Sequence, residues 1–135
     1  MADLGRDLAR QWIAKADGDL ASARILLFGE ERHLDTGAYH CQQAAEKALK
    51  AFLASRDAPL QRIHDLERLI SCCADHEPAF SRLMEKAAEI TPYATEFRYP
   101  GEILELSDED ARMAWAISAE IVEFVKARLS NGQVP

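Results

Sequence analysis

Apolar side chains recur at three- and four-residue steps along the first 28 residues, and this period constrains the fold more than any other feature. Arg, Lys and Asp fill the positions between the members of this stripe, which are Leu8, Trp12, Ala16, Leu20, Ala23 and Leu27. Because an α-helix turns once in about 3.6 residues, such steps place the apolar side chains on one face. The pattern predicts one long amphipathic helix from about Leu4 to Phe28.

A second helical pattern follows the turn-forming segment GEERHLDTG and opens at Asp35 or Thr36. Its predicted buried face is rich in small side chains and consists of Ala38, Cys41, Ala45, Ala48, Leu49 and Phe52. Pro59 removes a backbone donor, so the segment SRDAPLQR ends this helix. Because two long helices joined by a short loop pack side by side, we expect a closely spaced antiparallel pair.

Two shorter helical patterns come next. The segment IHDLERLISCCADHE predicts a helix that turns Leu66, Leu69 and Ile70 inward. Pro78 suits the first turn of the following helix, whose apolar stripe is Phe80, Leu83, Ala87, Ile90 and Tyr93. The segment TPYATEFRYPGEI then breaks the helical period with two prolines and a glycine, which indicates an irregular loop.

Ser107 and Asp110 have the spacing of a capping box and open the last helix, which should run through Leu129. Its predicted buried face is Ala111, Trp115, Ser118, Val122, Val125 and Leu129. The chain shows no alternating strand pattern and no internal repeat. The sequence therefore predicts an all-α fold, an up-and-down antiparallel bundle of four to five helices.

The length of 135 residues fits a single domain over residues 1–135, with a core over about 4–129 and a flexible tail at 130–135. The formal net charge of −7 would repel a polyanion unless basic residues gather on one face, so RNA is a disfavoured partner. The three cysteines lack disulfide or zinc-ligand spacing. The first residues are charged, and no apolar run approaches the roughly 20 residues of a membrane span, so we expect a cytoplasmic protein without membrane contact.

The second predicted helix also carries a row of polar residues, which are Gln42, Gln43, Glu46, Lys47 and Lys50. Several of these residues are four apart and share one side of the helix. One interpretation is a solvated face with one ion pair. The other is a polar seam between subunits or a row that faces a ligand, and the spacing alone does not separate the two.

His64 lies just before a predicted helix and has three candidate roles: a base, a ligand, or a cap for the amides of the first turn. His33, His40 and His76 have no carboxylate or cysteine partner at metal-ligand spacing, so we predict no metal site. Cys41 lies on the apolar face and is predicted to be a small core residue.

The segment FRYP, residues 97–100, places Arg98 between two aromatic residues and before a proline. Its guanidinium can stack and can bind phosphate or carboxylate in a bidentate way. The alternative is that Arg98 pins its loop to a carboxylate of the bundle, with Glu46 as one candidate. The sequence has no glycine-rich phosphate loop and no recognisable Ser/His/Asp arrangement, so it predicts no catalytic residue.

Taken in order, the segments ADGDLASARILL, DTGAYHCQQAAEKALKAFL, HDLERLI, FRYP and SDEDARMAWAISAEIVEFV resemble the HEPN domain family over roughly residues 8–129. The resemblance implies a helical bundle of four to five helices that forms a homodimer. It also implies a possible partner, because such bacterial proteins are often encoded beside a small nucleotidyltransferase of the MNT type in a toxin–antitoxin-like two-gene unit.

Many HEPN proteins look like metal-independent RNases in which four to six residues separate an arginine from a histidine. This chain departs from that pattern, because seven residues lie within each of the pairs Arg32–His40, Arg56–His64 and Arg68–His76. The resemblance therefore implies the branch that binds a nucleotide or a nucleotidyltransferase without cofactor or catalysis. The alternative is an RNase toxin with non-standard residues, using Arg98 as the cationic stabiliser and His64 as the base.

The same resemblance implies where a ligand or partner binds. The polar row of the second helix is expected to face the loop that carries the FRYP motif, and the neighbouring chain of a dimer would complete the groove. The residues expected to line this site are Tyr39, Gln42, Gln43, Glu46, Lys50, His64, Arg98 and Tyr99.

Overall fold

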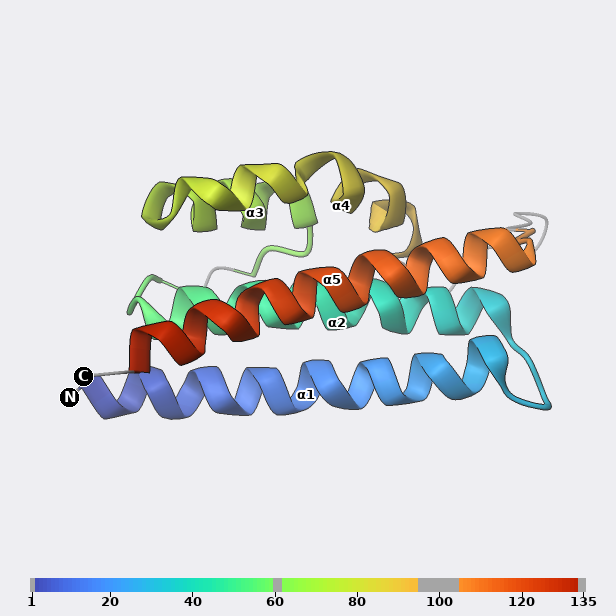
Figure 1. Cartoon of the computed structure of the whole chain (residues 1–135), viewed down its shortest axis with the longest axis horizontal. Coiled ribbons are helices and arrows are strands. Elements are labelled where there is room, and N and C mark those ends of the chain that lie inside the picture. The colour runs from blue at the N-terminus through green and yellow to red at the C-terminus, as the bar shows by residue number, and fades with distance from the viewer. Residues whose placement is uncertain (1, 60–61, 95–104, 134–135) are drawn as a thin grey trace.

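The computed structural model describes residues 2–59, 62–94 and 105–133. Over these ranges every regular element is helical, and the order is α1 (Ala2–Phe28), α2 (Leu34–Ser55), α3 (Leu66–His76), the 3-10 helix η1 (Pro78–Leu83), α4 (Met84–Ile90), the 3-10 helix η2 (Thr91–Ala94) and α5 (Asp108–Gln133). The predicted all-α bundle is confirmed (Figure 1).

The three long helices α1, α2 and α5 lie side by side, and α3, η1 and α4 form a shorter second layer over α2 and α5 (Figure 1). The core centres on α2, where all six residues of the predicted apolar face are fully buried. Gly37 lies at a close crossing, because a Cβ atom there would come within 2.6 Å of Leu27 Cδ2. Small residues thus allow the close α1–α2 packing that the sequence predicted.

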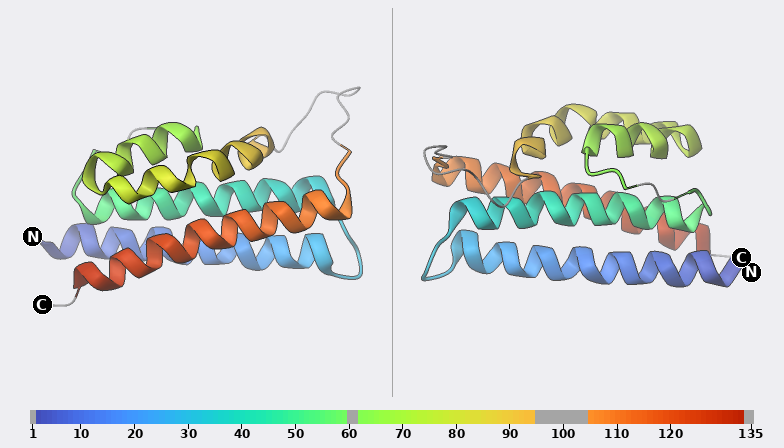
Figure 2. Two further views of the ribbon diagram at one scale, coloured as in Figure 1. Left: turned by 45° about the horizontal axis from the view of Figure 1, so that its top comes forward. Right: turned by 180° about the vertical axis from the view of Figure 1, so that it is seen from behind.

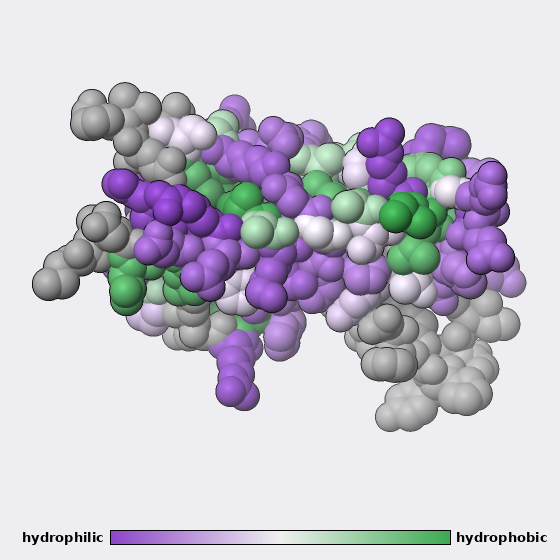
Figure 3. Space-filling model, turned by 90° about the horizontal axis from the view of Figure 1, so that it is seen from below, coloured by the Kyte–Doolittle hydropathy of each residue, from purple (hydrophilic) through white to green (hydrophobic). Residues whose placement is uncertain are grey.

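Seen from behind, α2 runs between α1 and the α3–α4 layer, and no helix of the described ranges crosses in front of it (Figure 2). On the side of α1, the surface is mostly hydrophilic with separate apolar patches (Figure 3). Exposed apolar side chains on α1 are Leu4, Leu8, Ile25 and Phe28. Within the described residues, no helix is both long and apolar enough to cross a bilayer.

The capping box is confirmed, because Ser107 Oγ accepts a hydrogen bond from the Asp110 amide at 3.0 Å and Asp110 Oδ2 accepts one from the Ser107 amide at 2.9 Å. Phe80, Leu83, Ala87 and Ile90 are buried as predicted. The single helix expected after Pro78 is instead a 3-10 helix that continues into α4.

Three further predicted details are wrong. Helix α2 begins at Leu34, because the His33 carbonyl already accepts a hydrogen bond from the Gly37 amide at 2.9 Å; Asp35 therefore lies inside the first turn. Leu8 is 38% exposed, since Ala9 takes the buried position of that turn against Ala51 and Ala54. Helix α5 continues to Gln133, so residues 130–133 of the expected tail are helical; no proline interrupts the backbone ladder before Pro135.

Candidate functional site

The polar residues of α2 are more buried than a solvated face allows. Gln42 is fully buried, and Glu46 and Lys50 are only 4% and 7% exposed. Tyr39, Gln43 and Lys47 are half-buried. The interpretation of this row as a solvated face is therefore wrong for its three buried members, because the chain around His64, ahead of α3, packs over that side of α2.

Glu46 is the centre of a first cluster, the Glu46 cluster, which consists of Gln42, Glu46, Lys50 and His64. Lys50 Nζ lies 3.1 Å from Glu46 Oε2, and His64 Nδ1 lies 3.3 Å from the same oxygen. Gln42 Nε2 donates to Glu46 Oε1 at 3.4 Å and to the His64 carbonyl at 3.3 Å. The carboxylate thus joins two turns of α2 to the segment that precedes α3.

The Glu46 cluster extends at both ends. Gln43 Nε2 donates to Gln42 Oε1 at 2.8 Å, which links the half-buried surface to the buried carboxylate. At the other end Lys50 Nζ lies 5.5 Å from the centroid of the Trp12 ring, within the range of a cation–π interaction. The Trp12 indole Nε1 is buried and has no hydrogen-bond partner among the described residues.

Asp19 of α1 is the centre of a second cluster, the Asp19 cluster, which consists of Asp19, His40 and Lys47. Asp19 is 9% exposed, its Oδ1 lies 2.8 Å from His40 Nδ1, and its Oδ2 lies 2.5 Å from Lys47 Nζ. The His40 ring also makes an edge contact with Tyr39, with centroids 5.5 Å apart. This cluster joins α1 to the half-buried edge of α2.

The Asp19 cluster was not predicted from the sequence, since no carboxylate partner for His40 was found at short spacing. The signal lay in the antiparallel pairing. Helix α1 ends at Phe28 and α2 begins at Leu34. Asp19 lies nine residues before Phe28, and Gln43 lies nine residues after Leu34. Asp19 therefore lies opposite the two turns of α2 that carry His40 and Lys47, which are seven residues apart.

His64 is 72% exposed at its side chain, although its Nδ1 faces the buried Glu46. The capping role considered for it is wrong, because the N-cap of α3 is Asp65, whose carboxylate accepts a hydrogen bond from the Glu67 amide at 2.9 Å. An imidazole held through Nδ1 presents its other nitrogen to the surface. The role of His64 as a base or ligand stays a prediction.

Arg98 and Tyr99 lie outside the described residues. Glu46, which was one candidate partner for Arg98, has Lys50 and His64 as its basic partners among the described residues. Within those same ranges no group of three or more His, Cys, Asp or Glu side chains is placed to hold a metal ion. Cys41 is a core residue as predicted, and burial raises the pKa of its thiol to about 11.

Residues 9–128 match the family profile described as HEPN domain. Among solved structures, TT1696 from Thermus thermophilus is similar with a TM-score of 0.76 and 24% identity, over 88% of this chain and 96% of that one. ST0689, an archaeal HEPN homologue, is similar with a TM-score of 0.70 and 25% identity, over 90% and 97%. A search among curated proteins finds no match. Because the family profile spans nearly the whole chain, this protein belongs to the HEPN domain family.

Proposed function

We propose that this chain is a non-catalytic, cytoplasmic HEPN homodimer that binds a partner nucleotidyltransferase through the polar side of α2, in a toxin–antitoxin-like two-gene system. One observation carries the proposal: two carboxylates balance the basic groups of this side. Asp19 is shared by His40 and Lys47, and Glu46 is shared by Lys50 and His64.

Side chains bind phosphate most strongly through positive charge that no carboxylate already neutralises. With neutral imidazoles, the two clusters together carry no formal net charge, so they offer little to a triphosphate. They do offer the side-chain amide of Gln43, which lies at a half-buried position. Such a surface suits hydrogen bonding to a protein partner, whose class the HEPN resemblance supplies.

The test is co-purification with a tagged small nucleotidyltransferase encoded beside this chain, followed by size-exclusion chromatography with light scattering. We expect the free chain to have twice the mass of a 15.1 kDa protomer and to form a stable complex with the partner. Gln43→Ala should weaken the complex by roughly tenfold, or about 1.4 kcal/mol. Lys86→Ala, which alters an exposed α4–α5 ion pair with Glu120, is the matched control.

A monomer at micromolar concentration would contradict the dimer. Binding that Gln43→Ala and Lys86→Ala weaken equally would contradict the assignment to α2. Tight binding of ATP or GTP in place of the nucleotidyltransferase would favour the nucleotide as the ligand, with Arg98 as the phosphate-binding group.

The contact between Glu46 and His64 favours a second candidate, an RNA-cleaving toxin. A buried carboxylate 3.3 Å from Nδ1 can hold an imidazole in the orientation that a general base needs, and Nε2 would then be the atom that accepts the proton. Incubation of tRNA and total RNA with the wild-type protein, His64→Ala and Arg98→Ala tests it. Cleavage lost in both variants would replace our proposal, whereas no cleavage by the wild type supports it.

A further inference from the structure

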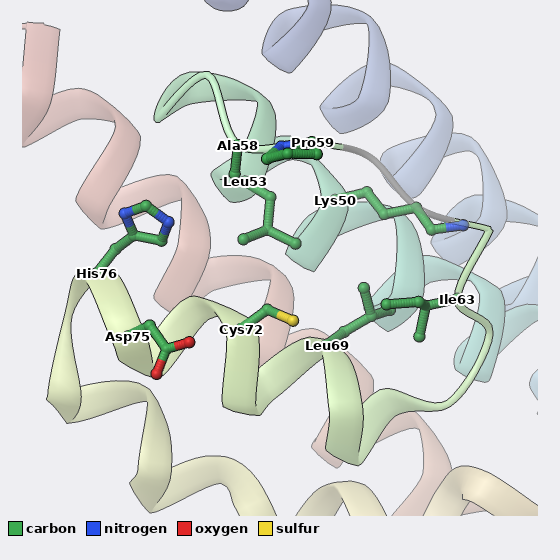
Figure 4. A pocket seen from close by; sticks show the side chains of 9 residues that line it. All are labelled: Lys50, Leu53, Ala58, Pro59, Ile63, Leu69, Cys72, Asp75 and His76. Atoms are coloured by element: carbon green, nitrogen blue, oxygen red, sulfur yellow. The ribbon is translucent and has the colours of Figure 1, made fainter.

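A cavity of about 190 Å³ lies between the end of α2, the start of the following loop and α3, outside both polar clusters except at one residue. Figure 4 shows the nine side chains that line it: Lys50, Leu53, Ala58, Pro59, Ile63, Leu69, Cys72, Asp75 and His76. Leu53, Ile63 and Leu69 are almost fully buried beside this space. An engineered cavity of about 150 Å³ with apolar walls binds benzene, so the size suits a small organic molecule.

Among the nine lining residues, the charged side chains and the imidazole lie at the two ends of the cavity. Lys50 extends toward Ile63 at one end, and Asp75 and His76 lie at the other, while the apolar walls and Cys72 lie between them (Figure 4). Asp75 and His76 are exposed and mark the mouth, whereas the side chain of Lys50 is only 9% exposed and marks the inner end. A ligand that enters would therefore place its apolar body between Leu53 and Leu69.

The surroundings of Lys50 indicate which chemical class of ligand the cavity can bind. An ammonium has three N–H donors, and among the described residues Glu46 Oε2 is its hydrogen-bond acceptor while the Trp12 ring faces it at 5.5 Å. Within the described part of the chain, this leaves N–H donors of Lys50 for another acceptor. The charge of Lys50 is already balanced by Glu46, so a second carboxylate in this nearly buried place would carry an uncompensated charge.

We infer that this cavity binds a small neutral molecule with an apolar body and one hydrogen-bond acceptor, such as a carbonyl oxygen, directed at Lys50. The inference is independent of the partner-binding proposal, because it concerns the α2–α3 side of Lys50 and needs neither a dimer nor a nucleotidyltransferase. It excludes nucleotides from this cavity, since their phosphates and ribose would meet apolar walls.

Cys72 provides a reporter inside the cavity. Cys41 and Cys73 are fully buried, and burial raises the pKa of both thiols, so few thiolates form there at pH 8. Cys72 is half-buried and lines the space. Labelling of the folded chain by Ellman's reagent therefore reports Cys72, and Cys72→Ser is the control that should abolish the fast labelling.

The experiment compares 2-heptanone with heptane, which has no acceptor, and heptanoate, which carries a charge. At about ten times its dissociation constant, 2-heptanone should slow Cys72 labelling by about tenfold, because the labelling rate follows the fraction of cavities that are unoccupied. Heptane and heptanoate should protect Cys72 from labelling less than 2-heptanone does at the same concentration. Ala58→Leu, which fills the cavity from its wall, should remove the protection while the far-UV circular dichroism stays that of the wild type.

Methyl NMR of Leu53, Ile63 and Leu69 gives a second reading in the wild-type protein, so the test does not depend on a variant that folds. We expect 2-heptanone to shift these methyl resonances and to leave those of α1 unchanged. Absence of both protection and shifts at saturating ketone would overturn the site. Equal protection by heptane or heptanoate would overturn the assigned ligand class.

Discussion

The Asp19 and Glu46 clusters each contain one carboxylate shared by a lysine and a histidine, but their carboxylate–lysine pairs differ in origin and in contact with water. Glu46 and Lys50 lie one turn apart on α2, with side chains 5% and 9% exposed. Asp19 comes from α1, and its side chain and that of Lys47 are 11% and 23% exposed. The Glu46–Lys50 pair is local and nearly buried, while the Asp19–Lys47 pair depends on the packing of two helices and lies closer to water.

The difference predicts unequal costs when the carboxylate is removed. Glu46→Ala leaves the Lys50 ammonium nearly buried without its anion, which should cost about 3–5 kcal/mol of unfolding free energy. Urea denaturation at pH 7 measures it. Glu120→Ala removes an exposed carboxylate from its pair with Lys86 and should cost less than about 1 kcal/mol. If Glu46→Ala lowered the free energy of unfolding by no more than this control, the result would contradict the burial of the Glu46–Lys50 pair.

Asp19→Ala should cost less, about 1.5–3 kcal/mol, because it removes charge-assisted hydrogen bonds from groups that can turn to water. The same urea titrations rank the two variants directly. A larger destabilisation by Asp19→Ala than by Glu46→Ala would contradict the claim that the Asp19 carboxylate contributes less to stability. Asp19→Asn is the companion variant, since it keeps the shape and removes the charge.

The Asp19 cluster also requires close approach of α1 and α2, which Gly37 allows. Gly37→Ala should destabilise by about 1–2 kcal/mol, because overpacking against the buried Leu27 exceeds the gain in helix propensity. Gly18→Ala is the matched control, since a Cβ atom at Gly18 meets nothing within 4 Å. Thermal unfolding should show that variant unchanged or stabilised by up to about 1 kcal/mol. Equal effects of the two substitutions would contradict the close crossing.

The smallest effect is expected at His64. With 72% of its side chain exposed, His64→Ala should cost less than about 1 kcal/mol. Thermal unfolding of this variant beside His40→Ala, whose side chain is 26% exposed, sharpens the contrast between the clusters. A larger loss for His64→Ala than for His40→Ala would show that the exposed histidine is structural.

Local patterns explain which features could be predicted. The apolar stripes and the Ser107–Asp110 capping box follow from spacings within a turn or two. The structure confirms the capping box and most members of the stripes, whereas Leu8 is exposed and Trp115 and Leu129 are half-buried. The spacing of Glu46 and Lys50 showed an ion pair but not its burial, because the segment around His64 covers it from a distance along the chain. The contact of His40 with Asp19 needed the pairing of two helices. Tertiary packing therefore decided what the candidate site contains.

The most direct test of the central claim is a calorimetric titration of this chain with the neighbouring nucleotidyltransferase and, separately, with ATP at about 150 mM salt. At that ionic strength the Debye length is about 8 Å, so long-range attraction is screened and contacts at the site decide the outcome. We predict saturable binding of the nucleotidyltransferase that Gln43→Ala weakens, and no measurable heat with ATP. Binding of ATP together with no binding of the nucleotidyltransferase would contradict the account.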